Sequence, residues 1–188
     1  MDAVLTCMVD EKIGPGEMNA RFIQSVKEFF KCDGAVAVRS PSIALKYAMK
    51  ALGAESGTTV MISALAPSWQ ILALEEFGYT PLVLDVDEAT ALVTADIVSE
   101  GIKKGGLILL LHETNGIMPD MDAIASLGIP VIEDISQSVG SSAPVPEGTE
   151  RTPAEAARAR AGLYGVFAIL SLEERDVVTA GGGAVVMA

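Results

Sequence analysis

Short apolar runs alternate with segments of helical spacing along most of the chain. Apolar runs of about four to eight residues between turn residues are typical of strands, and apolar residues three or four positions apart are typical of amphipathic helices. The pattern predicts strands at 35–39, 58–62, 81–87, 107–112, 130–134, 164–170 and 183–187. It predicts helices at 17–31, 66–77, 90–104 and 120–127, and another through Ala44, Leu45, Ala48 and Leu52 that stops at Gly53.

Three segments carry more detailed expectations. The helix at 17–31 has one apolar face, made of Met18, Phe22, Val26 and Phe29. The run AVAVR (35–39) is predicted to be a buried strand. Residues 141–161 hold prolines, glycines and an Ala/Arg/Glu stretch, which predicts a surface loop and a short helix.

Strands that alternate with helices, several of them apolar on both faces, predict a mostly parallel sheet that is covered on both sides. We therefore expect an α/β protein, built as a three-layer α/β/α sandwich with about seven strands. The length of 188 residues fits a single domain that occupies 1–188.

Composition narrows the possible partners. Half of the residues are apolar and the net charge is −12, so the chain can bury a core behind an acidic surface. Such a surface repels phosphate backbones and is unlike a polybasic membrane-binding surface, so we expect neither nucleic acid nor a membrane as a partner. Two cysteines, Cys7 and Cys32, and an N-terminus without a signal-peptide pattern predict a cytoplasmic location.

Polar residues follow several of the predicted strands, at the sheet edge where α/β proteins bind ligands. Asp134 ends VIED, and Gln137 follows it one turn later. A carboxylate at this place can keep a heteroaromatic nitrogen protonated, or it can simply cap the next helix. Ser40 and Ser42 flank Pro41 at a helix start, where hydroxyls and amides can hold a phosphate or merely cap the helix.

Two further features are weaker signals. His112 is the only histidine, so a histidine-based metal site is not expected, and a lone histidine is usually satisfied locally. The glycine run at 181–183 precedes a strand, which is more typical of a tight turn than of a phosphate loop.

Taken in order, these segments resemble the DegT/DnrJ/StrS family of fold-type-I aminotransferases, which use pyridoxal phosphate (PLP). The similarity runs from about residue 14 to the end through a GP turn, VRSPSIALKYAMKALG, GYTPLVLDVD, LLLHETNGIMPDMDAI, VIEDISQSVG and a final GGGAVV. The most specific part is PDMDAI followed by VIEDISQSVG.

The resemblance implies roles for individual residues. Asp134 matches the aspartate that pairs with the pyridine nitrogen of PLP, and Gln137 matches a glutamine near the other ring substituents. Ser42, together with Ser40, matches the serine and threonine of the SGT motif that holds the cofactor phosphate. His112 matches the histidine of the VH motif. Trp69 lies two residues beyond the position of the aromatic ring that stacks on the cofactor.

The chain also departs from the family pattern. Changed positions at the expected cofactor site are Pro41 for the glycine of SGT, Pro67 for the stacking aromatic residue, Ala168 for the serine of FSF and Gly181 for the glutamate of GEGG. The Schiff-base lysine falls on Arg175 or, with another alignment, on Glu173, and no lysine follows Lys104. Arginine stays protonated at neutral pH and cannot act as the nucleophile.

Three interpretations are compatible with these residues. The first is a degenerate, non-catalytic homologue kept for binding or assembly, without the small C-terminal domain of the family. The second is a PLP- or pyridoxamine-phosphate-dependent aminotransferase or dehydratase of nucleotide-linked keto sugars, completed by a partner chain that supplies the lysine and the small domain. The third is the same fold with a pocket that binds another acidic or phosphorylated small molecule without PLP. The resemblance also implies a homodimer.

Overall fold

The computed structural model describes residues 2–12, 14–144, 150, 152 and 159–188. The strands of its sheet are β1 (Ala35–Val38), β2 (Thr59–Ser63), β3 (Thr80–Leu84), β4 (Ile108–His112), β5 (Val131–Asp134), β6 (Phe167–Ser171) and β7 (Ala184–Met187). They lie in the order β1-β7-β6-β5-β4-β2-β3. The strands β3, β2, β4, β5 and β6 pair in parallel, and β7 is antiparallel to both of its neighbours.

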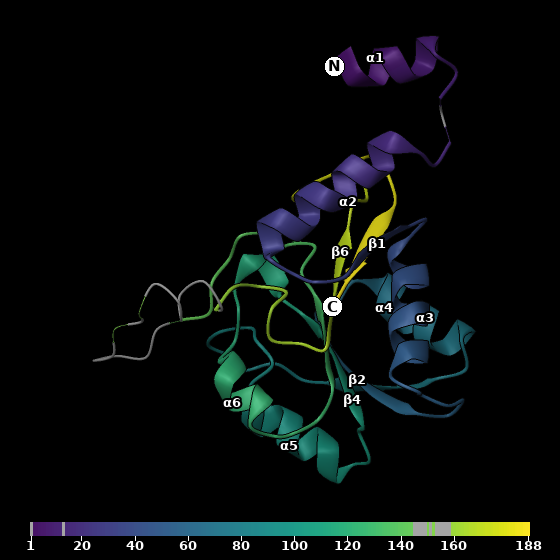
Figure 1. The fold of residues 1–188 in the computed structure, drawn as a ribbon. Helices are drawn as coiled ribbons and strands as arrows, with labels where there is room; N and C mark the ends of the chain where they lie inside the picture. Colours follow the sequence, from purple (N-terminus) through teal and green to yellow (C-terminus); the bar gives the residue numbers. More distant parts are fainter. Residues whose placement is uncertain (1, 13, 145–149, 151, 153–158) are drawn as a thin grey trace.

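Helices cover both faces of the sheet (Figure 1). The α-helices of the described residues are α1 (Asp2–Val9), which does not pack on the sheet, α2 (Glu17–Phe30), α3 (Pro41–Ala51), α4 (Ser68–Glu76), α5 (Ala95–Lys103) and α6 (Met121–Ala125). The core side chains of α2, α5 and α6 pack on one face, and those of α3 and α4 pack on the other. The predicted three-layer, mostly parallel α/β fold is therefore confirmed.

The central strand β4 shows why the layers form. All five of its residues are buried, and successive side chains point to opposite faces. Leu109 and Leu111 join the core under α5 and α6, whereas Leu110 joins the core under α3 and α4. A strand that is apolar on both faces has to be covered on both, which sets the sandwich.

Two detailed expectations were wrong. In α2 the buried aromatic residue is Phe30, whereas Phe29 is 51% exposed, because Phe30 lies four residues after the buried Val26 and so shares its face. Strand β1 is not buried: it forms one edge of the sheet, and Val36 is 59% exposed. An edge strand is paired on one side only, so its residues are less enclosed than those of β4.

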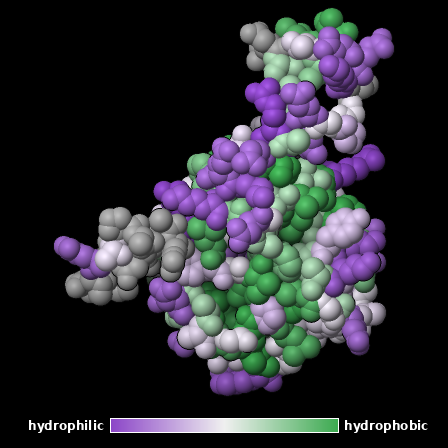
Figure 2. Space-filling model, viewed as in Figure 1, coloured by the Kyte–Doolittle hydropathy of each residue, from purple (hydrophilic) through white to green (hydrophobic). Residues whose placement is uncertain are grey.

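The N-terminal helix α1 was not predicted. It stands apart from the body of the molecule in Figures 1 and 2. Its large apolar side chains are exposed. The loop and short helix expected at 141–161 lie largely outside the described residues, although Ser142 and Arg160 at its ends form an antiparallel bridge. Among the described residues, no helix is both long and apolar enough to cross a bilayer.

Candidate functional site

The candidate site lies at the carboxyl ends of β4 and β5. These neighbouring parallel strands place His112 directly beside Asp134 in the register. Because paired residues of adjacent strands project to the same face, both side chains point toward the layer of α3 and α4. His112 is 5% exposed and Asp134 is fully buried.

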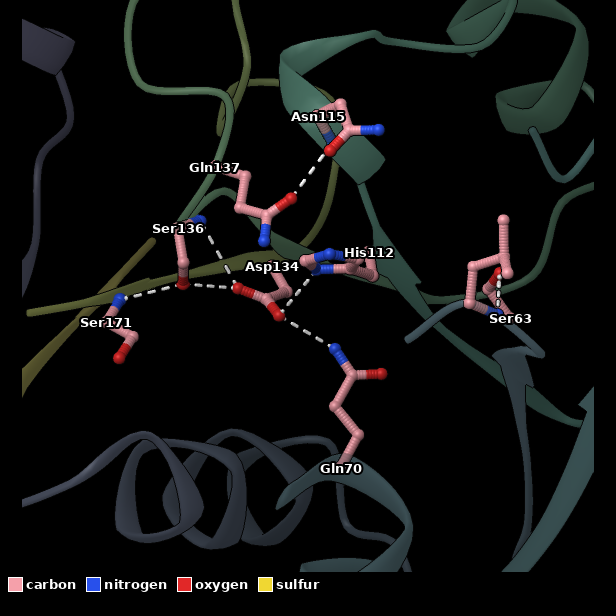
Figure 3. A network of polar contacts seen from close by, with 9 residues as sticks. Ser63, Gln70, His112, Asn115, Asp134, Ser136, Gln137 and Ser171 are labelled. Carbon is pink, nitrogen blue, oxygen red and sulfur yellow. Dashed lines mark hydrogen bonds and ion pairs between the residues drawn. The ribbon is translucent and has the colours of Figure 1, made fainter. Parts of the chain in front are cut away.

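Four hydrogen bonds converge on the Asp134 carboxylate (Figure 3). Gln70 Nε2 donates to Oδ2 at 2.8 Å, and His112 Nδ1 lies 3.0 Å from the same oxygen. The backbone N–H of Ser136 donates to Oδ1 at 3.2 Å, and the Ser136 hydroxyl donates to Oδ1 as well. A carboxylate accepts about four hydrogen bonds, so all of its acceptor positions are in use.

Hydrogen bonds connect the residues next to Asp134 to neighbouring elements. The Ser136 hydroxyl accepts a hydrogen bond from the backbone N–H of Ser171 at 3.0 Å, which links the end of β5 to β6. Gln137 is half-buried, and its Oε1 accepts from the backbone N–H of Asn115 at 2.9 Å. Gln137 therefore lies beside the site, as Figure 3 shows, but its carbonyl oxygen is already engaged.

The structure shows whether Asp134 and Ser40 act as helix caps, which was the simpler interpretation of each. No helix begins in 135–144, so Asp134 is not a helix cap: it closes a turn through Ser136. Ser40 does cap α3, because its Oγ accepts from the N–H of Ile43 at 3.3 Å with Pro41 at the first helical position. Ser42 is half-buried, and its hydroxyl has no hydrogen-bond partner within the described part of the chain.

The sequence analysis missed Gln70 and selected its neighbour Trp69. Trp69 is half-buried and packs against the apolar core under α3 and α4. Gln70 is fully buried and reaches Asp134 across 64 positions of sequence. A signal was present, because Gln70 precedes the buried Ala73 and Leu74 by three and four residues and so lies on the buried face of α4.

The residues at the expected lysine position are exposed. Arg175 and Glu173 lie in the connection from β6 to β7, and neither forms an ion pair with a described residue. The glycine run makes the tight turn that the sequence indicated, since Gly181, Gly182 and Gly183 all have positive φ values. The N–H groups of Ala180 and Gly182 both donate to the carbonyl of Leu172.

A second buried polar group lies on the opposite face of the sheet and was also missed. Glu133 Oε1 accepts from the N–H of Tyr164 at 2.8 Å and from that of Gly165, and Oε2 accepts from the N–H of Gly162 at 2.9 Å. These bonds hold the strap 162–165 against β5, just before β6 begins.

Glu113, the residue that follows β4, lies close to this strap-binding carboxylate. Its side chain is fully buried, with a relative exposure of 0%. Burial, and then the charge of Glu133, raise the pKa of Glu113 to about 9. At neutral pH Glu113 is therefore a neutral acid in the core.

The residues present do not fit PLP as the structure stands. The carboxylate that would meet the pyridine nitrogen is fully buried and already accepts four hydrogen bonds. The exposed lysines of α3 do not lie at Asp134, because Lys46 and Lys50 line a separate cavity of about 510 Å³ with Phe77 and Tyr79. Lys46 Nζ lies 5.0 Å from the centre of the Phe77 ring. Within the described ranges, no group of His, Cys, Asp or Glu residues is arranged to hold a metal ion.

Comparison with known proteins gives a consistent picture. A model of the DegT/DnrJ/EryC1/StrS aminotransferase family matches residues 1–188. The L-glutamine:2-deoxy-scyllo-inosose aminotransferase of Micromonospora echinospora is 25% identical over 178 residues, which cover 92% of this chain and 39% of that protein.

Two solved structures show the same fold. DesV of S. venezuelae, solved in complex with a ketimine intermediate, is 25% identical with a TM-score of 0.80, over 98% of this chain and 48% of DesV. NtdA of Bacillus subtilis, solved with bound PMP, is 19% identical with a TM-score of 0.81, over 99% of this chain and 40% of NtdA. The chain thus spans less than half the length of each of these three relatives.

Proposed function

The chain belongs to the DegT/DnrJ/EryC1/StrS aminotransferase family, and from that premise we propose that it is a degenerate member. It keeps the cofactor-domain fold but does not catalyse transamination by itself, and it acts as a binding or assembly protein. The chain covers only part of the length of its relatives, so any statement on the substrate and partners of the whole protein is likewise a proposal.

The observation that carries this proposal is the residue at the Schiff-base position. Transamination with PLP needs a lysine amine that bonds to the cofactor and then moves a proton. By the family resemblance this position falls on Arg175 or Glu173, which lie in the connection from β6 to β7, and no lysine occurs in 105–188. A guanidinium stays charged at neutral pH, so it has no free electron pair for attack on the aldehyde.

Incubation with PLP followed by borohydride reduction tests the proposal. We expect no single lysine to become labelled stoichiometrically, because none lies in the segment that would hold it. Peptide mapping by mass spectrometry gives the labelled fraction of each lysine, with the exposed Lys12 and Lys31 as internal references for non-specific labelling. One lysine labelled far above these references would refute the non-catalytic assignment.

A second candidate is a PLP- or PMP-dependent aminotransferase or dehydratase of nucleotide-linked keto sugars that a partner chain completes. It is favoured by one observation, that the Micromonospora relative, 25% identical over 178 residues, is an aminotransferase. The same labelling experiment on the protein together with its co-purifying chains separates the two. A reduced pyridoxyl-lysine on an accompanying chain supports this second candidate, and its absence supports the first.

We also propose that the chain forms a homodimer in which α1 contributes to the contact. Helix α1 exposes Val4, Leu5, Met8 and Val9 by 53–82%, and it stands apart from the body of the molecule. Apolar side chains gathered on one exposed helix are stabilised when a partner covers them. The double substitution Leu5→Glu and Met8→Glu is expected to shift the protein to monomer in sedimentation velocity, whereas Leu72→Glu on α4 is not. A monomeric wild-type protein would contradict the proposal.

A further inference from the structure

Only one of the donors to Asp134 comes from outside the sheet and its turns. The two Ser136 donors are two residues away in the chain, and the Ser136 hydroxyl is itself held by the N–H of Ser171. His112 belongs to the neighbouring strand and is fixed by the β4–β5 register. Gln70 belongs to the covering helix α4, so it is the donor that can be changed without altering the sheet.

Gln70 is an unusual choice for a core position. Its side chain is fully buried, and while its Nε2 donates to Asp134 at 2.8 Å, its Oε1 has no hydrogen-bond partner. A buried acceptor without a partner lowers stability, so an apolar residue of similar size would pack at this position at a lower cost. The amide is therefore explained by what its N–H group does at Asp134 rather than by packing.

We propose that Gln70 takes the place at Asp134 that a protonated heteroaromatic nitrogen takes in catalytic relatives, and that it thereby excludes pyridine-type cofactors from the site. The inference rests on the proposed function and deepens it. A side-chain amide N–H and a pyridinium N–H are both single donors to one carboxylate oxygen. Since the other three acceptor positions of Asp134 are occupied by Ser136 and His112, the two donors compete for one place.

A shorter side chain at position 70 is expected to open this place. Gln70→Ala removes the donor and leaves a hollow beside Asp134, which then has an unpaired buried acceptor. Such an acceptor favours a ligand that brings its own N–H. Specificity for the ligand follows from the same pairing, because the gain in binding requires the carboxylate.

Fluorescence of Trp69 provides the measurement. It is the only tryptophan and is the residue next to Gln70, so a ligand at Asp134 changes its emission. The probe is pyridoxine 5′-phosphate, which carries the ring nitrogen and the phosphate but no aldehyde, so it cannot label lysines. We expect Gln70→Ala to bind the probe at least about tenfold more tightly than the wild-type protein, and the double variant Gln70→Ala, Asp134→Asn to lose that gain.

Three results would overturn the inference: tight probe binding by the wild-type protein, a gain that persists in the double variant, or an equal gain in Leu72→Ala. Leu72 lies on the exposed side of α4 and is a matched truncation away from Asp134. Gln70→Ser is measured as a second truncation of this side chain, so that the inference is still tested if the alanine variant fails to fold. Covalent labelling of a wild-type lysine tests the proposed function separately, because this experiment reads only reversible binding.

Discussion

The free energy of unfolding of the wild-type protein is expected to fall between pH 4.5 and about 9, and replacing Glu113 by glutamine is expected to remove this fall. In the folded protein, burial and the charge of Glu133 raise the pKa of Glu113 from 4.5 to about 9. The folded state therefore keeps a proton that the unfolded state has already released in this window. The free energy of unfolding consequently falls as the pH rises, by about 1.4 kcal/mol per pH unit.

The direction of this pH dependence distinguishes Glu113 from a carboxylate whose charged form is stabilised by hydrogen-bond donors. Below pH 4.5 both states are protonated at Glu113, and the penalty is absent. Above about 9 the folded state also loses the proton, and a negative charge then faces the carboxylate that holds the strap 162–165. Glutamine keeps a neutral side chain of the same length at all of these pH values, so it removes the slope.

Urea unfolding at several pH values between 5 and 8 measures this difference. We expect the free energies of unfolding of wild type and Glu113→Gln to diverge with pH, by several kcal/mol at the alkaline end. The exposed Glu55→Gln is the matched control and should follow the wild-type curve. Parallel curves for wild type and Glu113→Gln would show that Glu113 is not buried as a neutral acid.

Gly165→Ala is expected to destabilise the protein by about 3 kcal/mol or more. A Cβ atom at this position would lie 2.7 Å from the carbonyl oxygen of Val131 and 2.9 Å from that of Phe167. Both oxygens belong to the backbone of paired strands and cannot move away without disturbing the β5–β6 pairing. The N–H of Gly165 also donates to Glu133, so a shift of the strap weakens that contact too.

Thermal or urea unfolding measures the loss, and Gly34→Ala provides the comparison. The nearest atom to a Cβ at Gly34 is the carbonyl oxygen of Ala188 at 3.8 Å, which is an ordinary contact. Gly34→Ala should therefore leave stability within about 1 kcal/mol of wild type. Equal losses in the two variants would contradict the close approach of backbone at Gly165.

Several features were already determined by local sequence. Runs such as ILLLH are apolar at every position, which a strand tolerates only when both of its faces are covered, so they specify the layered α/β fold. Chemistry-bearing residues at strand ends, His112 and Asp134 among them, follow from the rule that parallel strands gather their carboxyl ends at one edge. The family resemblance and the absence of lysine from 105–188 were likewise visible in the residues alone.

The tertiary structure decided which residues meet. Periodicity gives the face of an element but not its neighbours, so it could not show that β7 lies between β1 and β6 or that β1 becomes an edge. Nor could it show that Gln70, 64 residues from Asp134, supplies the fourth hydrogen bond. The neutral acid at Glu113 depends in the same way on Glu133 from the adjacent strand. These contacts depend on strand order and helix placement, because a hydrogen bond or a charge interaction is set by distance in space rather than along the chain.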